Sequence, residues 1–179
     1  MSHSKVSNWP GALRYSNRPI YHASVNKEVR HFLQSGPTGA KETDNTPCKV
    51  YIRKIADSAH PAHGQCGLFA GKRIPPNAFI LDYIGEVHCE DRPESDYDLS
   101  LHRFPDGLSV GIDASRVGNE ARFTNDYRGV QKKPNAFFTD YRTQSGELRM
   151  CIKSRGEIKK GEEILISYGK SWWSNREDE

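Results

Sequence analysis

The amino-acid sequence predicts a mostly β protein with a few short helices, a fold of the α+β class. Short apolar and β-branched runs alternate with groups of turn residues along most of the chain, which is the pattern of short strands in several small sheets. Helical periodicity is confined to short stretches. The runs that we expect to form strands span residues 50–55, 67–70, 78–87, 99–104, 108–112, 135–141, 148–153 and 163–167.

Two pairs of these runs are expected to form β-hairpins. The tripeptide Pro105-Asp106-Gly107 lies between 99–104 and 108–112, and Asp-Gly between apolar runs is a strong hairpin signal. A polar turn at residues 143–146 separates the next two runs in the same way. Local pattern predicts these neighbours but not the order of strands within the sheets.

The N-terminal part contains the clearest helical pattern, over residues 25–34. Ser24 is its expected N-cap, and Gly36-Pro37 is expected to end it. One or two turns of a second helix are expected at residues 114–119. The apolar residues of the first helix share one face: Val25, Val29, Phe32 and Leu33.

The pattern favours one β-rich domain with an N-terminal extension. Residues 1–47 form this extension, which is expected to be partly helical or flexible, with a Gly-, Pro- and Thr-rich linker at 35–47. The domain is expected to span residues 48–173. Residues 174–179 form an acidic C-terminal tail.

Composition excludes several classes of protein. The formal net charge of +3 is too small to predict nucleic-acid binding by itself. No run approaches the ~20 apolar residues of a membrane helix, and the first residues lack the apolar core of a signal peptide. We therefore expect no membrane contact and a nuclear location, with the cytoplasm as the alternative. The cysteines have no CxxC spacing, which argues against structural zinc or another metal and favours reduced thiols: Cys48, Cys66, Cys89 and Cys151.

A local acidic cluster lies in the middle of the chain. Two interpretations stay open at this point: a solvated loop, or a surface that attracts a basic peptide. The second gains weight if an active site lies beside the cluster. Its members are Glu86, Glu90, Asp91, Glu94, Asp96 and Asp98.

Four separated segments, in order, resemble the motifs of the SET-domain family. Gly64-Gln-Cys-Gly-Leu-Phe-Ala70 resembles the family's Gly-x-Gly turn, and Leu81-Asp-Tyr-Ile-Gly-Glu-Val87 its Tyr-x-Gly-Glu strand. Gly118-Asn-Glu-Ala-Arg-Phe-Thr-Asn125, after Asp113-Ala114, resembles the Arg-Phe-x-Asn segment. Gly161 through Gly169 resembles the last motif, which ends in Tyr-Gly. Together the segments cover about residues 64–173.

The resemblance implies a SET-domain fold of several small sheets around a C-terminal pseudoknot. It also implies a lysine methyltransferase that uses S-adenosylmethionine, with cofactor and lysine entering from opposite faces of one narrow channel. Methyl transfer to an amine needs a neutral amine, whereas a free lysine has a pKa of about 10.4. A tight apolar channel disfavours the ammonium, and alignment of amine with methyl carbon supplies much of the rest.

Tyr168 is the expected catalytic residue by this resemblance. Its phenol would orient and polarise, because a phenol is mostly neutral near pH 7. Tyr83 is expected to line the lysine channel. The alternative interpretation, a half-buried strand tyrosine with only a structural role, has nearly equal weight. Ile166, two residues before Tyr168, leaves room where some family members have a tyrosine. We therefore expect methylation beyond one methyl group.

Cofactor contacts are expected from the first and third motifs, and substrate contacts from the acidic cluster and the chain end. A glycine in the first motif permits close approach to a ligand. Tyr97 is expected at the cofactor or the channel, and one of two tryptophans at each site. The candidate cofactor-binding residues are Gln65, Cys66, Gly67, Leu68, Tyr97, Arg122, Phe123, Asn125, Asp126 and Trp172. The candidate substrate-binding residues are Tyr83, Ile166, Glu86, Asp96 and Trp173.

The sequence departs from the family pattern in two ways. Asp126 replaces the histidine of the usual Asn-His-Ser-Cys segment, and an ionised carboxylate cannot donate a hydrogen bond. The following loop is longer and carries Arg128, Lys132 and Lys133, which favours either a solvated loop or contact with a nucleosome. The cysteine-rich flanks of many SET domains are missing, so the extension or the tail must complete the substrate groove.

Three functions remain open on these residues. The first is a protein-lysine methyltransferase acting on a basic protein, in particular a histone tail, to which an acidic surface is complementary. The second is a SET-like chromatin scaffold without catalysis, for which the altered Asn125-Asp126 segment is the motive. The third is a methyltransferase for a non-histone protein.

Overall fold

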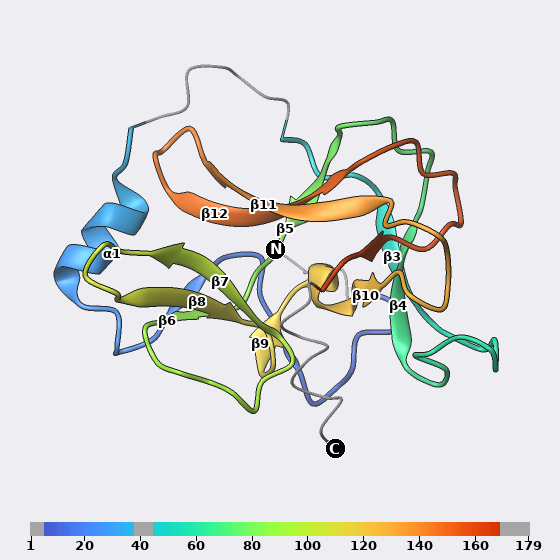
Figure 1. Cartoon of the computed structure of the whole chain (residues 1–179), viewed down its shortest axis with the longest axis horizontal. Helices are drawn as coiled ribbons and strands as arrows, with labels where there is room; N and C mark the ends of the chain where they lie inside the picture. The colour runs from blue at the N-terminus through green and yellow to red at the C-terminus, as the bar shows by residue number, and fades with distance from the viewer. Residues whose placement is uncertain (1–5, 38–44, 169–179) are drawn as a thin grey trace.

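The computed structural model describes residues 6–37 and 45–168, and within them it forms several small sheets with one α-helix (Figure 1). The predicted mostly β class is confirmed. The sheets have the strand orders β2-β6-β8-β7, β11-β12-β5 and β3-β4, and two short parallel pairs join β1 to β9 and β10 to β13.

The four-stranded sheet contains the first predicted hairpin. Its strands are β2 (Ile20–Tyr21), β6 (Glu86–His88), β8 (Ser109–Asp113) and β7 (Asp98–Arg103). Strands β7 and β8 are antiparallel neighbours, as expected, with an irregular register between Ser100 and His102.

The three-stranded sheet contains the second predicted hairpin. Strands β11 (Ala136–Arg142) and β12 (Leu148–Ser154) pair antiparallel, and β12 also pairs with β5 (Phe79–Asp82). The predicted single strand at 78–87 is wrong, because β5 and β6 belong to different sheets. The chain changes sheets at Gly85, where a Cβ atom would lie 2.5 Å from the backbone oxygen of Asp113, so only glycine permits this approach.

Strands β3 (Val50–Lys54) and β4 (Cys66–Ala70) form an antiparallel pair. The loop between them, residues 55–65, turns back through a series of backbone hydrogen bonds that ends with Gly64 N–H donating to Ile55 O (2.9 Å). This loop reaches the functional site described below.

The N-terminal part is joined to the sheets by two short strands that local pattern did not predict. β1 (Arg14–Tyr15) pairs in parallel with β9 (Val117–Gly118), and β2 pairs in parallel with β6. The predicted helix is present as α1 (Lys27–Gln34), with Val29 and Leu33 buried. Ser24 is not its cap: Asn26 accepts from Val29 N–H (2.9 Å), while Ser24 Oγ accepts from Cys89 N–H.

The helix predicted at 114–119 is wrong. A bend and strand β9 (Val117–Gly118) occupy residues 114–119, and a 3₁₀ helix, η1 (Glu120–Phe123), follows them. Asn119 sets the change of direction, since its side-chain oxygen accepts from Ala121 N–H and its amide donates to Asp82 O (2.8 Å). Asparagine favours such local side-chain-to-backbone bonds over a helix interior.

The last strand, β13 (Leu165–Ile166), is shorter than the predicted 163–167 and runs in parallel beside β10 (Asn125–Asp126). Asn135 joins these segments from the loop before β11: its Nδ2 donates to Glu163 O and its Oδ1 accepts from Leu165 N–H (2.8 Å each). This crossing of the C-terminal strand with the chain around 125–135 brings two sequence motifs together.

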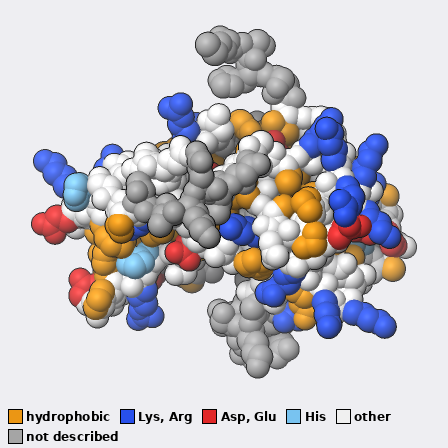
Figure 2. All heavy atoms as spheres, turned by 90° about the horizontal axis from the view of Figure 1, so that it is seen from above, with side chains coloured by type: hydrophobic (Ala, Val, Ile, Leu, Met, Phe, Trp, Pro, Cys, Tyr) orange, Lys and Arg blue, Asp and Glu red, His pale blue; other side chains and the backbone are white. Residues whose placement is uncertain are grey.

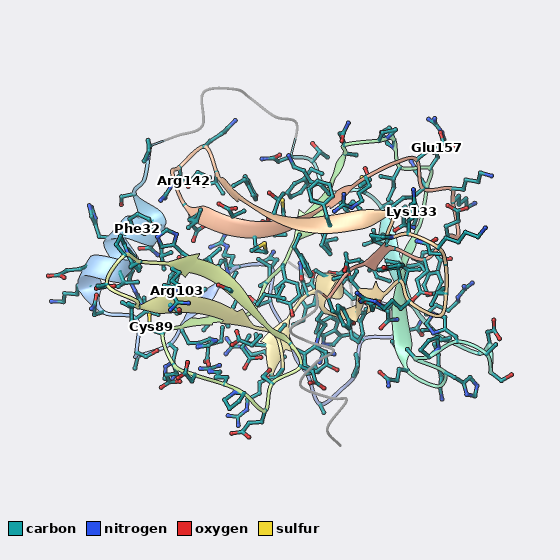
Figure 3. All side chains as sticks on the ribbon, viewed as in Figure 1. Phe32, Cys89, Arg103, Lys133, Arg142 and Glu157 are labelled. Atoms are coloured by element: carbon teal, nitrogen blue, oxygen red, sulfur yellow. The ribbon has the colours of Figure 1, made fainter. Side chains whose placement is uncertain are left out.

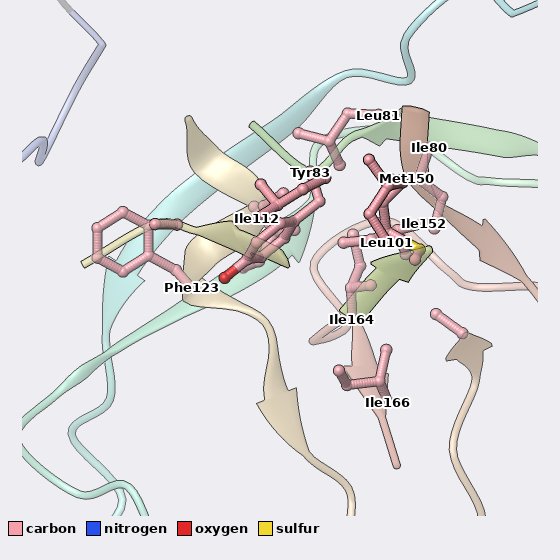
Figure 4. Packing of buried hydrophobic residues seen from close by; sticks show 14 of the residues in the cluster. Ile80, Leu81, Tyr83, Leu101, Ile112, Phe123, Met150, Ile152, Ile164 and Ile166 are labelled. Carbon is pink, nitrogen blue, oxygen red and sulfur yellow. The ribbon is translucent and has the colours of Figure 1, made fainter. Parts of the chain in front are cut away.

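The core lies between the three-stranded and four-stranded sheets. In Figure 4, Met150 and Ile152 of β12 face Leu101 of β7, and Ile112 lies beside Tyr83. Of the described residues, no helix is long and apolar enough to cross a membrane. Lys and Arg side chains project at several points around the edge of the face in Figure 2, rather than in one continuous field.

Candidate functional site

A cavity of about 950 Å³ opens where η1, β10 and β13 meet β4 and β7. Elements from four of the five sheet groups contribute to its wall, together with the 55–65 loop. The lining residues that the sequence analysis had named are Gln65, Cys66, Tyr83, Asp96, Tyr97, Arg122, Phe123, Asn125, Asp126, Ile166 and Tyr168.

Some predicted residues lie elsewhere. Gly67, Leu68 and Glu86 do not line the cavity, and Leu68 is completely buried in the core. Gly67 instead makes room for a neighbour, because a Cβ atom there would lie 2.5 Å from Glu163 Oε1. Trp172 and Trp173 lie outside the described residues.

Tyr168 is held at both ends. Its hydroxyl donates to Thr124 O (2.9 Å), and its backbone N–H donates to Asp126 Oδ2 (2.8 Å). Burial raises the pKa of the Tyr168 phenol well above its ordinary value, and the nearby carboxylate of Asp126 raises it further. The phenol is therefore neutral and available as a dipole.

Tyr83 also lines the cavity and is 5% exposed. Its hydroxyl donates to Tyr97 O (2.7 Å), and its ring meets Phe138 edge-on at 5.3 Å between centroids. Burial raises the pKa of Tyr83 far above its ordinary value. Together with Leu99, these rings form an apolar part of the cavity that suits the stem of a long side chain.

Asn125 belongs to a network of hydrogen-bonded side chains that forms the polar part of the cavity. Its Nδ2 donates to Glu163 Oε1 (2.9 Å) and to Cys66 O (3.3 Å). The second oxygen of Glu163 bonds His60 Nε2 (3.0 Å), and His60 Nδ1 accepts from Ala62 N–H, which places the ring proton on Nε2. The His60 and Glu163 side chains are 7% and 8% exposed.

Sequence reasoning missed His60 and Glu163. Glu163 lies within the last motif and was read only as the start of a strand. His60 had no signal, since it precedes the first motif, which begins at Gly64. Asp98 of the acidic cluster and Arg128 of the basic loop also line the cavity. Other lining residues that were missed are Pro10, Pro61, Ala62, Leu99, Ser100, Ala121, Thr124, Phe138 and Ser167.

Asp126, the main departure from the family pattern, acts as an acceptor. Besides Tyr168 N–H, its carboxylate accepts from the backbone N–H of Arg128 (2.8 Å) and from Arg128 Nη1 (2.9 Å). Charge-assisted hydrogen bonds of this kind are about twice as strong as neutral ones. The carboxylate thus links the altered loop to the backbone of Tyr168.

Arg122 lies between two rings of the cavity wall. Its guanidinium carbon is 4.0 Å from the centroid of Tyr97 and 4.9 Å from that of Phe123, and its Nε donates to Ala114 O (2.9 Å). Among the described residues no partner occupies its terminal nitrogens. They remain available for an anion.

The acidic cluster is partly neutralised by Arg92. This guanidinium bonds Glu86 (2.7 Å), Glu90 (3.2 Å) and Asp113 (3.0 Å), so Glu86 belongs to a structural network rather than to the cavity. Asp98 is bonded to the buried His88 (2.9 Å). Asp96 and Asp98 are the acidic members of the cluster that line the cavity.

The fold and this site define a class of β-rich domains in which the C-terminal strand, β13, pairs in parallel with β10 where the chain crosses itself. A solved structure of ATXR5 in complex with histone H3.1 superposes with a TM-score of 0.67, covering 88% of this chain and 81% of that one at 18% identity. A structure of apo ctPRC2 in an autoinhibited state gives a TM-score of 0.55 at 23% identity, over 69% of this chain and 16% of that one. These likenesses concern the fold.

The SET-domain family model matches residues 65–169, and the chain belongs to this family. It is 38% identical over 156 residues to the histone-lysine N-methyltransferase set-2 of Caenorhabditis elegans, covering 80% of this chain and 10% of that protein. It is 36% identical over 134 residues to Set2 of Drosophila melanogaster, covering 68% of this chain and 5% of that protein.

The name of a third relative describes it as inactive. The chain is 25% identical over 178 residues to the inactive histone-lysine N-methyltransferase 2E of Mus musculus, covering 92% of this chain and 9% of that protein. The chain thus spans about a tenth or less of the length of these curated relatives.

The donor set of the cavity fits S-adenosylmethionine. Arg122 offers cationic donors for a carboxylate, and Asn125 Oδ1 accepts no hydrogen bond from the described residues, so it can accept from an ammonium. The aromatic face of Phe123 and the peptide groups of 65–66 suit an apolar ring system. Within residues 6–37 and 45–168, no three His, Cys, Asp or Glu side chains converge on a metal position.

Proposed function

We propose that this chain is an S-adenosylmethionine-dependent protein-lysine N-methyltransferase. The observation that carries the proposal is the pair of neutral phenols, the partly buried Tyr168 and the buried Tyr83, in one cavity that has a polar and an apolar part. The relatives named above as histone-lysine N-methyltransferases support it. We propose a histone tail as the substrate.

The cofactor occupies the polar part of the cavity in this proposal. Arg122 binds its carboxylate, Asn125 its ammonium, and Phe123, Asp126 and the Gln65-Cys66 backbone border its ring system. When bound, S-adenosylmethionine supplies an electrophilic methyl group. Because Glu163 and His60 fix the amide of Asn125, Asn125 needs no rearrangement when the cofactor enters.

The substrate lysine occupies the apolar part. Tyr83, Phe138 and Leu99 remove water from its stem, which lowers the pKa of its ammonium and favours the neutral amine. Tyr168, fixed through its hydroxyl and its backbone, orients the amine lone pair. Its raised pKa means that it acts as a dipole and not as a general base.

Ile166 is relevant to the number of methyl groups that the enzyme adds. It lines the cavity two residues before Tyr168 and has no hydroxyl that could hold a water molecule in the amine's path. We therefore propose that the enzyme adds more than one methyl group. Asp96 and Asp98 at the cavity favour a cationic peptide.

The remaining expectations stay proposals. We propose a nuclear protein in which residues 48–173 form the SET domain, residues 1–47 the extension and 174–179 an acidic tail. The loop from Arg128 to Lys133 is the proposed nucleosome contact. Its lysines, Lys132 and Lys133, are exposed, as contact with an acidic surface or DNA phosphate requires.

The test combines binding with transfer. Binding of S-adenosylhomocysteine is measured by calorimetry, followed by transfer of labelled methyl to histones and to a cell extract. Tyr168→Phe is expected to retain binding and to lower the transfer rate about 100-fold. Tyr141→Phe is the matched control, since that hydroxyl bonds Asp82 (2.8 Å) away from the cavity.

The outcomes separate the three functions. Labelled extract without labelled histones favours a non-histone target. The inactive relative motivates the scaffold as the second candidate, and binding without transfer in either preparation, or no binding at all, favours it. Equal activity of Tyr168→Phe and wild type contradicts the role of the phenol.

A further inference from the structure

Trp9 connects the N-terminal segment to the wall of the cavity. Its ring meets Phe123, which lines the cavity, edge-on at 5.6 Å between centroids and 89° between planes. On its other side it meets Tyr15 at 5.1 Å and 87°. With Arg122 stacked between Tyr97 and Phe123, these groups form a continuous array from the cavity to the surface.

The segment that carries Trp9 is anchored to the domain at several points. Asn8 Nδ2 donates to Ile52 O of β3 (2.8 Å), while Trp9 Nε1 donates to Leu13 O (2.7 Å) within the segment and so fixes the indole relative to it. Strand β1 follows directly and pairs with β9, immediately before η1. Pro10 completes the segment's contribution, because it lines the cavity itself.

Arg122 and Phe123 lie on a short 3₁₀ helix, whose hydrogen-bond geometry is weaker than that of an α-helix. Trp9 packs on the side of Phe123, and edge-to-face aromatic pairs favour one relative orientation of the rings. The N-terminal segment therefore holds the wall that presents Arg122.

We propose that residues 6–15 form part of the cofactor site, with Pro10 as a wall residue and Trp9 as a positioning residue that fixes Phe123 beside the cofactor's ring system and Arg122, stacked on Phe123, at its carboxylate. The inference rests on the proposed function. It assigns the cofactor side of the cavity, and not the lysine side, to the N-terminal segment, because Phe123 and Arg122 are the groups that Trp9 supports.

The experiment compares substitutions at Trp9 in the full chain by calorimetry with S-adenosylhomocysteine. Trp9→Ala removes the ring and is expected to weaken binding about tenfold. Trp9→Phe keeps an aromatic edge toward Phe123 and is expected to stay within about threefold of wild type. Trp9→Leu keeps apolar bulk without the edge and is expected to behave like Trp9→Ala.

The control is Phe32→Ala. Phe32 is a partly exposed aromatic residue (36%) on α1, at the opposite end of the molecule from Lys133 of the loop that follows β10 (Figure 3). Its ring contacts His102 and Phe104, neither of which lines the cavity. Binding by Phe32→Ala is expected to equal wild type even where its melting temperature falls.

A kinetic readout separates positioning from general destabilisation. Trp9→Ala is expected to raise the KM for S-adenosylmethionine and to leave the KM for a histone peptide unchanged. If Trp9→Ala does not fold, Trp9→Leu decides. Wild-type affinity for S-adenosylhomocysteine in Trp9→Leu, or equally weakened binding in Trp9→Leu and Trp9→Phe, overturns this inference and leaves the proposed function standing. Absence of binding in the wild-type protein overturns the proposed function and this inference with it.

Discussion

Replacement of Asp126 by alanine tests how the altered motif supports Tyr168. The carboxylate accepts from two backbone N–H groups, those of Tyr168 and Arg128, each at 2.8 Å. Alanine leaves both donors without an acceptor, and a hydrogen bond to a charged group contributes about 1.5–3 kcal/mol. The Arg128 ion pair adds little, ~0.5 kcal/mol, because the arginine is more than a third exposed.

Two such bonds sum to about 3–6 kcal/mol. The expected loss of stability is lower, about 2–4 kcal/mol, because cavity water can reach these N–H groups. For a chain of this size that corresponds to a fall in melting temperature of about 5–15 °C. Asp126→Asn keeps one acceptor oxygen and is expected to lie between. The transfer rate should fall because Tyr168 loses its backbone anchor, and cofactor affinity should also fall because Asp126 borders the proposed site of the cofactor's ring system.

Thermal unfolding followed by circular dichroism measures the first effect, and single-turnover methyl transfer the second. Asp140→Ala on β11 is the control, because Asp140 is exposed and such changes stay within about 0.5 kcal/mol. A melting temperature for Asp126→Ala within ~2 °C of wild type would refute the reasoning. The carboxylate would then be a passive replacement for the family's histidine.

Three further predictions concern acid stability, the first motif and the product. Burial alone would raise the pKa of Asp113, but hydrogen bonds from serine and arginine neighbours outweigh this effect and hold the pKa below its ordinary 3.8. The stability that Asp113 contributes is therefore fully present above pH 3.8 and is lost as the pH falls through the lower pKa of the folded state. In urea unfolding, Asp113→Asn should lose less free energy of unfolding than wild type when the pH is lowered. Gly67→Ala pushes a Cβ against the Glu163 carboxylate, so it should lower the free energy of unfolding by about 1–3 kcal/mol and weaken S-adenosylhomocysteine binding. Gly156→Ala is the control, because open space surrounds that position, and it should have neither effect. Equal effects of the two substitutions would count against the packing argument. Ile166→Tyr should shift the products toward monomethyl-lysine in mass spectra, and a wild-type protein that stops at one methyl group would remove that idea.

The strands and hairpins were predictable because their signals are local. Alternation and Pro-Asp-Gly chemistry placed β7 and β8 without knowledge of the rest of the chain. The parallel pairs were not predictable in this way, since two-residue strands such as β1 are defined only by a partner far along the sequence. Asn119 shows the same limit: its side chain bonds distant backbone, which turned an expected helix into a strand and a 3₁₀ turn.

The candidate site was predictable where a motif names the residue. Tyr168, Asn125 and Arg122 line one cavity, and the resemblance had grouped them. His60 and Pro10 could not be found, because each comes from a segment without a motif and reaches the cavity only through the fold. Charge counting misjudged Glu86, since a single arginine among the acids cancels much of the cluster's charge.

The parallel pairing of β10 with β13, and of β1 with β9, has a kinetic consequence. Contacts between segments far apart in the sequence form slowly, because the chain must lose loop entropy before they stabilise anything. Arg14 pairs with Val117, and Asn125 with Leu165, so the cavity wall is complete only when the N-terminal segment and the C-terminal strand have both docked. We expect folding to be slow for a domain of this size, and partly folded chains to lack any competent site.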